Sequence, residues 1–255
     1  MLECSQMTPM STGLKCDETL NRLDDAHSRL AQFSADLAHE LRTPIHVMMG
    51  QTEVALSKER QPDEYRRILE SNLEEYQRLS RMIDGLLFLA RAENPQTRIE
   101  RNRHDARQEL EAIREFYEAL ADDQGVSVTS KGQANLYADP ILFRRAVSNL
   151  LSNALRHTPR GGQIVMSAEQ TAEHGTLVRV SDTGCGITDE DLPRLCERLY
   201  CPDQGTARCA EGTGLGLAIV KSIAELHSGT VAVASSPGQG TVVTLHFPKP
   251  ALAGA

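Results

Sequence analysis

The first third of the chain shows apolar residues three or four positions apart, which is the spacing of amphipathic helices. One such run spans residues 17–57, and a second follows Pro62. A short polar segment separates the two runs, and Pro62 followed by Asp63 and Glu64 suits the first turn of a helix. Two long helices joined by a short loop predict an antiparallel hairpin.

The apolar stripe of the second helix is too wide for one hairpin to cover. Its members fall at helical spacing: Tyr65, Ile68, Leu69, Leu73, Tyr76, Leu79, Ile83, Leu86 and Leu87. A four-helix bundle made by two copies of the hairpin would bury this stripe. The sequence therefore predicts a homodimer with closed two-fold symmetry.

The pattern changes after a polar, proline-containing stretch at residues 93–104, which predicts a linker. Beyond it we expect helices over 105–122, 140–157 and 214–227, and strands over 126–129, 134–137, 163–168, 176–181, 230–234 and 241–247. Most of these strands follow one another as hairpins, which indicates an α+β sandwich and not a parallel doubly wound sheet. The predicted division is a flexible segment 1–16, a helical hairpin 17–92, a linker 93–104 and an α/β domain 105–250.

Composition narrows the function classes. The chain has 255 residues, of which 40% are hydrophobic and 24% charged, as in ordinary globular proteins. A net charge of -8 argues against nucleic acid as a partner. The sequence has no run of 18 apolar residues and no apolar signal-peptide core near its start. We therefore expect a cytoplasmic location.

Six cysteines are present, and none forms a C-x-x-C pair. In a chain without a secretion signal they are expected to be reduced thiols. Cys196, Cys201 and Cys209 nevertheless cluster in one segment, so a redox or soft-metal role for them stays open.

The segment FSADLAHELRTPIHVMMG at residues 33–50 carries candidate chemistry in its helical pattern. It groups His39, Glu40 and Thr43 immediately before Pro44. Proline inside a helix removes a hydrogen bond and usually kinks the helix, at about 3 kcal/mol. Stability alone gives little reason to place a kink beside a His-Glu pair. Taken by itself, however, His39 is more often an ordinary histidine of a coiled-coil helix.

A polar stripe marks the helix predicted over residues 140–157. Asn149 and Asn153 are four positions apart and therefore share one face. Amide oxygens are hard ligands that suit Mg²⁺, and the nearby Arg156 can pair with a phosphate. Two asparagines on a helix are more often caps or exposed residues. This pair therefore indicates a nucleotide site only in combination with other segments.

Two glycine-containing segments complete the set. Asp182 closes a predicted strand and can accept a hydrogen bond from an exocyclic amine such as that of adenine, and the following Gly184 and Gly186 allow a ligand to approach closely. Residues 211–217, EGTGLGL, precede a helix, whose N-terminal amides can hold phosphates. No Gly-Lys-Ser/Thr follows, so this is not a Walker loop, and no βαβ unit surrounds it as in a dinucleotide site.

In this order and spacing, the segments resemble the phosphoacceptor, N, G1 and G2 boxes of sensor histidine kinases of two-component systems. The first box of that family reads His-Glu-(Leu)-(Arg)-Thr-Pro, and residues 238–241 resemble its final glycine box. FSADLAHELRTPI, LLSNALRHTPRGG and EGTGLGLAIVKSI resemble the heavy-metal (copper or silver) type in particular. The resemblance implies a hairpin dimerisation domain followed by an ATP-binding α/β sandwich of the histidine kinase, gyrase and Hsp90 type.

The resemblance also implies roles. His39 would attack the γ-phosphorus of ATP, Glu40 would fix the ring tautomer and take up the proton, and Thr43 would orient water for a phosphatase reaction. The phosphoryl group would then pass to an aspartate of a response regulator. The nucleotide residues implied are Asn149, Asn153 as the Mg²⁺ ligand, Arg156, His157 stacked on adenine, Asp182, Gly184, Gly186, Gly212, Thr213, Gly214, Leu215 and Gly216.

The chain departs from the family at residues 196–201, CERLYC, where the family usually has Phe-Glu-Arg-Phe-Tyr-Arg. Two aromatic residues and one arginine are missing, so we expect a looser lid at residues 203–210 and slower catalysis. The family's usual membrane spans and sensor domain are also missing. The chain is expected to be either the cytoplasmic part of an inner-membrane protein, attached through a missing N-terminal region, or a naturally soluble relative.

Three other functions compete with the kinase. A non-catalytic dimeric nucleotide-binding signalling scaffold is the main alternative, because the lid segment is altered. A gyrase-like or Hsp90-like ATPase is disfavoured because a hairpin carrying His39 comes first. A zinc protease is disfavoured because no histidine stands at position 43.

Overall fold

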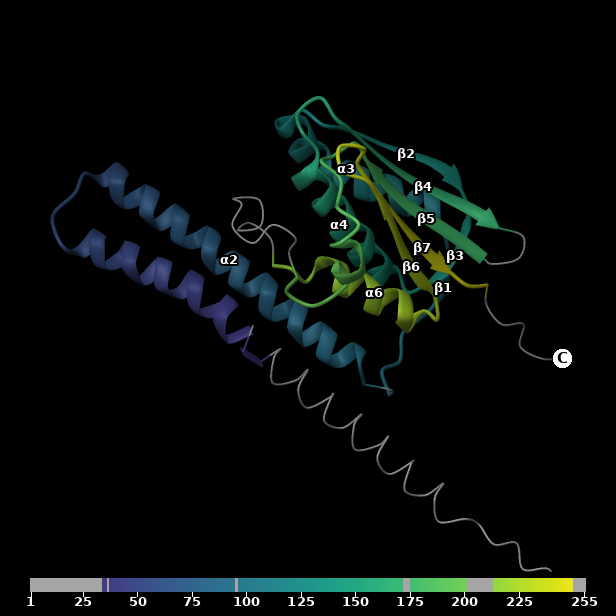
Figure 1. Cartoon of the computed structure of the whole chain (residues 1–255), viewed down its shortest axis with the longest axis horizontal. Coiled ribbons are helices and arrows are strands. Elements are labelled where there is room, and N and C mark those ends of the chain that lie inside the picture. The colour runs from purple at the N-terminus through teal and green to yellow at the C-terminus, as the bar shows by residue number, and fades with distance from the viewer. Residues whose placement is uncertain (1–33, 36, 95, 172–174, 201–212, 250–255) are drawn as a thin grey trace, which may run out of the picture. The chain divides into compact units, whose positions relative to one another are not determined.

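The computed structural model describes residues 34–35, 37–94, 96–171, 175–200 and 213–249. The chain divides into two compact units, Met1–Leu79 and Ser80–Ala255. Figure 1 labels α2 and the other helices and strands of the second unit.

The first unit contains the hairpin that the helical spacing predicted. Its first helix runs over residues 37–56, and α2 is Pro62–Ala92, with two acidic residues in its first turn. The two helices are joined through side chains, since Gln51 Nε2 donates to Ser71 Oγ at 3.3 Å and Asn72 Nδ2 donates to Thr52 Oγ1 at 3.3 Å. The antiparallel hairpin is therefore confirmed over these residues (Figure 1). Most of the earlier part of the first predicted helix, and the segment 1–16, lie outside the described residues.

The second unit adds seven strands and three α-helices to the end of α2 in the described part of the chain. In chain order the elements are β1 (Asn102–Asp105), α3 (Ala106–Gln124), β2 (Ser127–Gln133), β3 (Asn135–Ala138), α4 (Pro140–His157), β4 (Gln163–Thr171), β5 (Gly175–Asp182), the short 3₁₀ turn η1 (Leu192–Arg194), α6 (Gly216–Leu226), β6 (Thr230–Ser235) and β7 (Thr241–Phe247). Five strands form one sheet in the order β2-β4-β5-β7-β6. Only the β2–β4 pair in this sheet is parallel.

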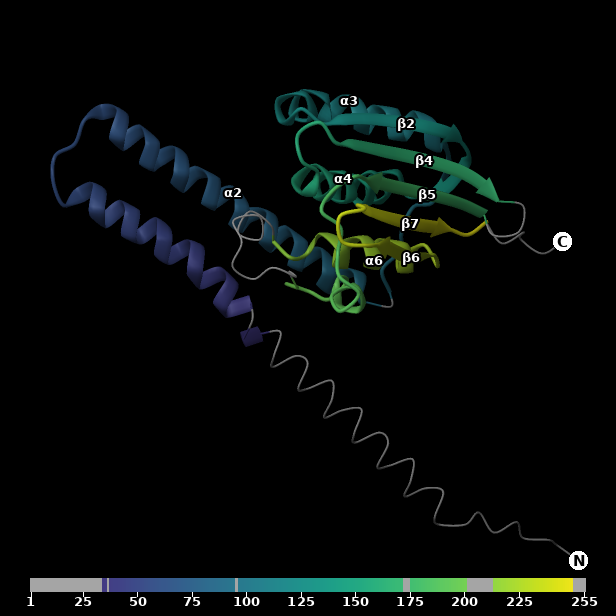
Figure 2. The same ribbon diagram turned by 45° about the horizontal axis from the view of Figure 1, so that its top comes forward.

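Helices α3, α4 and α6 lie against one face of this sheet (Figures 1 and 2). Strand burial alternates accordingly, and the inward positions are Ile164, Met166, Ala168, Val178, Val180, Val243, Leu245 and Phe247. Burying one large apolar side chain contributes about 1.5–3 kcal/mol, so this layer is the main source of the unit's stability. The predicted α+β sandwich is confirmed.

The helix α4 shows how its sequence separates core from site. Asp139 caps its N-terminus by accepting from the backbone N–H groups of Ile141 and Leu142, which stabilises such a helix by about 1 kcal/mol. Its buried face consists of Phe143, Ala146, Val147, Leu150, Leu151, Ala154 and Leu155. Asn149 and Asn153 lie on the other side, where the helix is only half-buried.

One strand forms where the sequence predicted a linker. β1 pairs antiparallel with β3, so that Asn102 faces Ala138 in a separate two-stranded sheet. Upstream of it, the end of α2 from Ser80 packs within the second unit and buries Met82 and Leu89.

Candidate functional site

His39 lies on the first helix of the hairpin, and its side chain is exposed. The hydroxyl of Thr43, one turn later, donates to the His39 carbonyl at 3.2 Å. Within the described residues no hydrogen bond joins the His39 ring to the Glu40 carboxylate. The exposed His39 side chain is therefore accessible to an incoming electrophile in this unit.

The helix continues through Pro44, which is buried. Because proline has no N–H group, the carbonyl of Glu40 loses its partner within the helix. The helix is locally weakened one residue after the histidine, and the kink predicted there stays a prediction.

On α4, Asn149 and Asn153 are neither caps nor fully exposed residues. Both are half-buried in the middle of the helix, and the caps are Asp139 and Thr158. Among the residues that the structure describes, buried Asn149 Nδ2 has no hydrogen-bond partner, whereas Asn153 Oδ1 accepts from Arg156 Nη1 at 3.4 Å. A buried amide left unpaired costs about 1–3 kcal/mol, so Asn149 fits a ligand that would complete its bonding.

Asp182 is the last residue of β5, and its carboxylate is half-buried. Its Oδ1 accepts from the backbone N–H of Gly184 at 2.8 Å and from that of Thr241 at 3.2 Å. Burial raises the pKa of this carboxyl, while the two backbone hydrogen bonds oppose the rise. Because both bonds end on Oδ1, Oδ2 remains the oxygen that a ligand amine would meet.

The turn after Asp182 packs against the end of α4. A Cβ atom added at Gly184 would come within 2.7 Å of both Asp182 Oδ1 and the His157 carbonyl oxygen. Cys185 donates its N–H to the same carbonyl at 3.3 Å. Gly186 has φ +70, and a Cβ there would meet the Ser236 carbonyl oxygen at 2.0 Å. A larger residue at position 184 would thus push the turn away from the end of α4, and one at position 186 would clash with the backbone at Ser236.

The second glycine segment lies beside the same face of α4. α6 begins at Gly216, where an added Cβ would lie 3.2 Å from Asn153 Nδ2. Leu215 before it is buried, and Thr213 and Gly214 are half-buried. The structure therefore brings a helix N-terminus against Asn153. Gly212 and the predicted lid at 203–210 lie outside the described residues.

Two features of the site escaped sequence reasoning. The N–H of Thr241 holds Asp182, and only the pairing of β5 with β7 reveals it, since the register sets these residues opposite each other. Leu199, in the altered segment, has φ 61 and donates its N–H to the Gly214 carbonyl at 3.0 Å. A left-handed leucine costs of order 1–2 kcal/mol, and no local sequence pattern signals this conformation.

Other candidate chemistry receives less support. Within the described residues no group of three or more His, Cys, Asp and Glu side chains could hold a metal ion. Cys185 is exposed, and burial raises the pKa of the half-buried Cys196. Cys201 and Cys209 are outside the described residues. Over the described residues, no helix has both the length and the apolar character needed to cross a membrane.

The polar set fits a magnesium nucleotide by its chemistry. Asn149 and Asn153 offer amide groups, Arg156 a guanidinium and Asp182 a carboxylate acceptor, and the start of α6 offers backbone N–H groups. Among the described residues, the Asn149 Nδ2 group has no hydrogen-bond partner and could donate to a ligand oxygen.

Comparisons with known proteins agree with this assignment. The His Kinase A (phospho-acceptor) domain matches residues 29–95, and the histidine kinase-, DNA gyrase B- and HSP90-like ATPase family matches residues 138–251. The sensor protein IrlS of Burkholderia pseudomallei is 47% identical over 229 residues, which are 90% of this chain and 49% of the relative. The sensor histidine kinase CusS of Escherichia coli K12 is 46% identical over 235 residues, or 91% of this chain and 48% of the relative.

The chain thus spans about half the length of these relatives. Among solved structures, histidine kinase ThkA in complex with response regulator protein TrrA matches with a TM-score of 0.71 at 20% identity, covering 92% of this chain and 66% of that chain. This likeness supports the fold. The predicted resemblance, including that to the heavy-metal type, is confirmed. The chain belongs to the sensor histidine kinases and contains a phosphoacceptor domain followed by an ATP-binding domain.

Proposed function

We propose that the chain is an ATP-dependent protein-histidine kinase that phosphorylates His39 and passes the phosphoryl group to an aspartate of a response regulator. One observation carries most of this proposal. The Asn149–Asn153 face of α4, the Asp182 turn and the start of α6 lie together. Asn149 Nδ2, on that face, has no partner within the described part of the chain.

At the nucleotide, Asp182 Oδ2 accepts from the exocyclic amine of adenine, and the ring of His157 stacks on the base. Arg156 and the N–H groups of residues 212–216 bind phosphate oxygens. Asn153 ligates Mg²⁺ through its amide oxygen, and Asn149 binds close by. When bound, the ion neutralises charge that develops during phosphoryl transfer. Gly184, Gly186, Thr213, Gly214 and Leu215 shape the backbone around the ligand.

In the hairpin, a neutral nitrogen of His39 attacks the γ-phosphorus in line, and the bond from that phosphorus to the ADP oxygen breaks. Glu40 hydrogen-bonds the other ring nitrogen, holds the tautomer and accepts its proton. In the phosphatase reaction, Thr43 orients the water molecule that hydrolyses the phosphoaspartate of the regulator. Pro44 lets the His39 end of the helix bend between the two activities.

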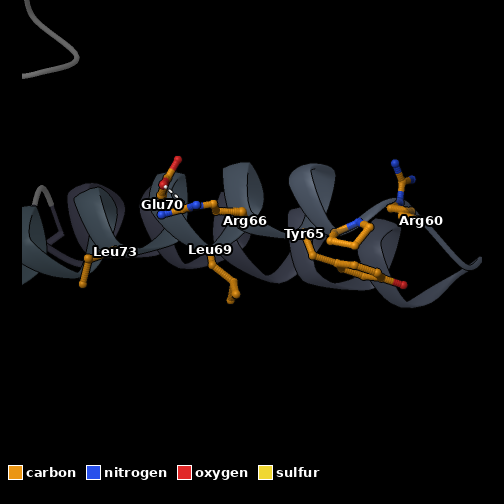
Figure 3. A pocket seen from close by; sticks show the side chains of 7 residues that line it. Arg60, Tyr65, Arg66, Leu69, Glu70 and Leu73 are labelled. Atoms are coloured by element: carbon orange, nitrogen blue, oxygen red, sulfur yellow. Dashed lines mark hydrogen bonds and ion pairs between the residues drawn. The ribbon is translucent and has the colours of Figure 1, made fainter.

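The hairpin also supports the proposed homodimer. Figure 3 shows Tyr65, Leu69 and Leu73 along α2, while Arg66 and Glu70 form an ion pair at 3.2 Å. Leu69 and Leu73 are 68% and 56% exposed, so this face of a single copy is left in water. A second hairpin of the same chain would cover it as a four-helix bundle.

We further propose the division predicted above, with a hairpin at 17–92, a linker at 93–104 and the catalytic domain at 105–250. The response-regulator partner is supported by the regulator bound to ThkA, a kinase of the same fold. We propose that this signalling part acts in the cytoplasm, either as part of an inner-membrane sensor or as a naturally soluble relative; it matches about half the length of the sensor proteins it resembles.

Incubation with γ-labelled ATP and Mg²⁺ tests the activity. Wild type should acquire label that is stable in alkali and lost in acid, and His39→Gln should acquire none. His46→Gln is the matched control, because His46 is an exposed histidine two turns further along the same helix. Label that persists in His39→Gln would refute the assignment. Nucleotide binding without any label would favour the non-catalytic scaffold.

A further inference from the structure

Helices α4 and α6 run antiparallel and meet at both ends. At the nucleotide end, Gly216 of α6 approaches the Asn153 amide. At the far end, His227 follows the last turn of α6 and contacts Asp139, the residue that caps α4. The two helices that carry nucleotide-binding residues are therefore joined at the end away from the site.

His227 makes this junction through both of its ring nitrogens. Its side chain is buried, with the whole residue only 1% exposed. Nε2 accepts from the Asp139 N–H at 2.9 Å, and Nδ1 lies 2.7 Å from the Ile223 carbonyl oxygen. Because the backbone N–H of Asp139 can only donate, the ring must be neutral, with its proton on Nδ1. The ring also meets Phe247 of β7 edge-on, with the centroids 5.3 Å apart.

The structure assigns His227 a positioning role in nucleotide binding. Its bond to Asp139 fixes the position of α6 along the axis of α4, and therefore the position of the Gly214–Gly216 loop relative to Asn153. A rigid helix carries a shift at one end to the other, and α6 has only 11 residues between loop and junction. This inference rests on the proposed nucleotide site, although His227 itself would contact no nucleotide.

The charged neighbours of the ring are few among the described residues. Arg101, which precedes β1, donates to the Leu226 carbonyl at 2.7 Å and opposes protonation of His227, while the Asp139 carboxylate favours it. Burial is the largest influence and lowers the pKa of His227. The acceptor at Nε2 is therefore kept at neutral pH.

Two substitutions separate positioning from packing. His227→Gln can place its amide oxygen near the Nε2 position and still accept from Asp139. His227→Asn can place its amide nitrogen near Nδ1 and keep the bond to Ile223, but it loses the bond to Asp139. Each variant loses one hydrogen bond and the ring contact with Phe247, so both should lose similar thermal stability.

We expect His227→Asn to bind a non-hydrolysable ATP analogue with Mg²⁺ about tenfold more weakly in calorimetry, and His227→Gln to stay within about threefold of wild type. In the unliganded protein, the backbone NMR signals of Gly214 and Gly216 should shift in the Asn variant only. Autophosphorylation should show a raised KM for ATP in the Asn variant, with kcat nearly unchanged.

Equal weakening in both variants, in step with their loss of thermal stability, would overturn the positioning role and leave His227 a packing residue. Unshifted Gly214 and Gly216 signals in His227→Asn would do the same. Failure of wild type to bind the analogue would instead refute the proposed nucleotide site. The NMR comparison in unliganded protein would still test the junction in that case.

Discussion

The half-buried Asp182 carboxylate destabilises the fold in its ionised form. Burial raises its pKa, so folding favours the protonated form of this carboxyl. Its contribution to stability is therefore present at low pH and declines as pH rises from the ordinary value of 3.8 through the raised pKa. At neutral pH the ionised carboxylate opposes folding, and a ligand amine would offset that cost.

Asp182→Asn should separate these two roles. The asparagine oxygen can keep both backbone hydrogen bonds, while an NH₂ group replaces Oδ2. We expect an equal or higher melting temperature of the unliganded protein, and ATP affinity at least tenfold weaker, because two donors would then face each other. Calorimetric titration and thermal unfolding monitored by circular dichroism measure the two quantities. A lower melting temperature together with unchanged ATP affinity would contradict this role for Asp182.

Site residues that belong to a local sequence pattern could be predicted, whereas residues that reach the site through long-range pairing could not. Asp182 could be found because an aspartate at a strand end before two glycine residues is a local pattern. Thr241 could not, because it meets Asp182 only through the pairing of β5 with β7, which joins residues 59 positions apart. His227 was likewise read only as the end of a helix, since its partner Asp139 lies 88 positions away.

Among the elements, the helices were predictable from spacing because each buries one face of its own. The strand β1 was not, since its sequence NRHD is polar and half-exposed. It forms because β3 supplies a pairing edge. The strand β2 was predicted as four residues and extends to Gln133, because its parallel pairing with β4 continues along polar positions. Pairing between distant segments therefore explains β1 and the extension of β2, which the spacing of apolar residues did not predict.

The junction between α4 and α6 should make stability depend on pH. The folded pKa of His227 is lower than its ordinary value of 6.5, so the unfolded chain binds the proton more readily. The contribution of His227 is full above about pH 6.5 and is lost as pH falls through the lowered pKa, by at most about 1.4 kcal/mol per pH unit. Urea unfolding between pH 5 and about pH 7.5 measures it.

His227→Gln is the control for this pH dependence, because it removes the titrating group. The difference in unfolding free energy between wild type and this variant should shrink as pH falls. A difference that stays constant over this pH range would show that folding does not change the pKa of His227, contrary to the effect expected from its burial.

For the whole molecule, the sequence predicted two functional parts and their order, and the family matches at residues 29–95 and 138–251 agree with that order. The structure places the end of α2, from Ser80, with the second unit. Helical spacing gives no sign of this, because apolar helix positions such as Met82 and Leu89 look the same in the sequence whether they pack on a helix or on another domain. The exposed apolar face of the hairpin, in contrast, was predictable from spacing alone.

Charge placed on that face should separate the proposed dimer. We expect Leu69→Glu combined with Leu73→Glu to be monomeric at micromolar concentration in light scattering coupled to size exclusion, since burying two carboxylates costs far more than the lost apolar contact. Arg66→Ala, on a neighbouring exposed position, is the control and should behave as wild type. A dimer that persists in the double variant would show that the interface does not include this face.

Mass spectrometry of the chain after reaction with ATP and Mg²⁺, digested and analysed at neutral to alkaline pH, tests the central claim most directly. It should find one phosphoryl group on His39, none on His46, and much less phosphate on His39 when Asp182→Asn or Asn153→Ala replaces wild type at the same ATP concentration. Phosphate on a different residue, or no phosphate in a protein that binds ATP, would contradict the account.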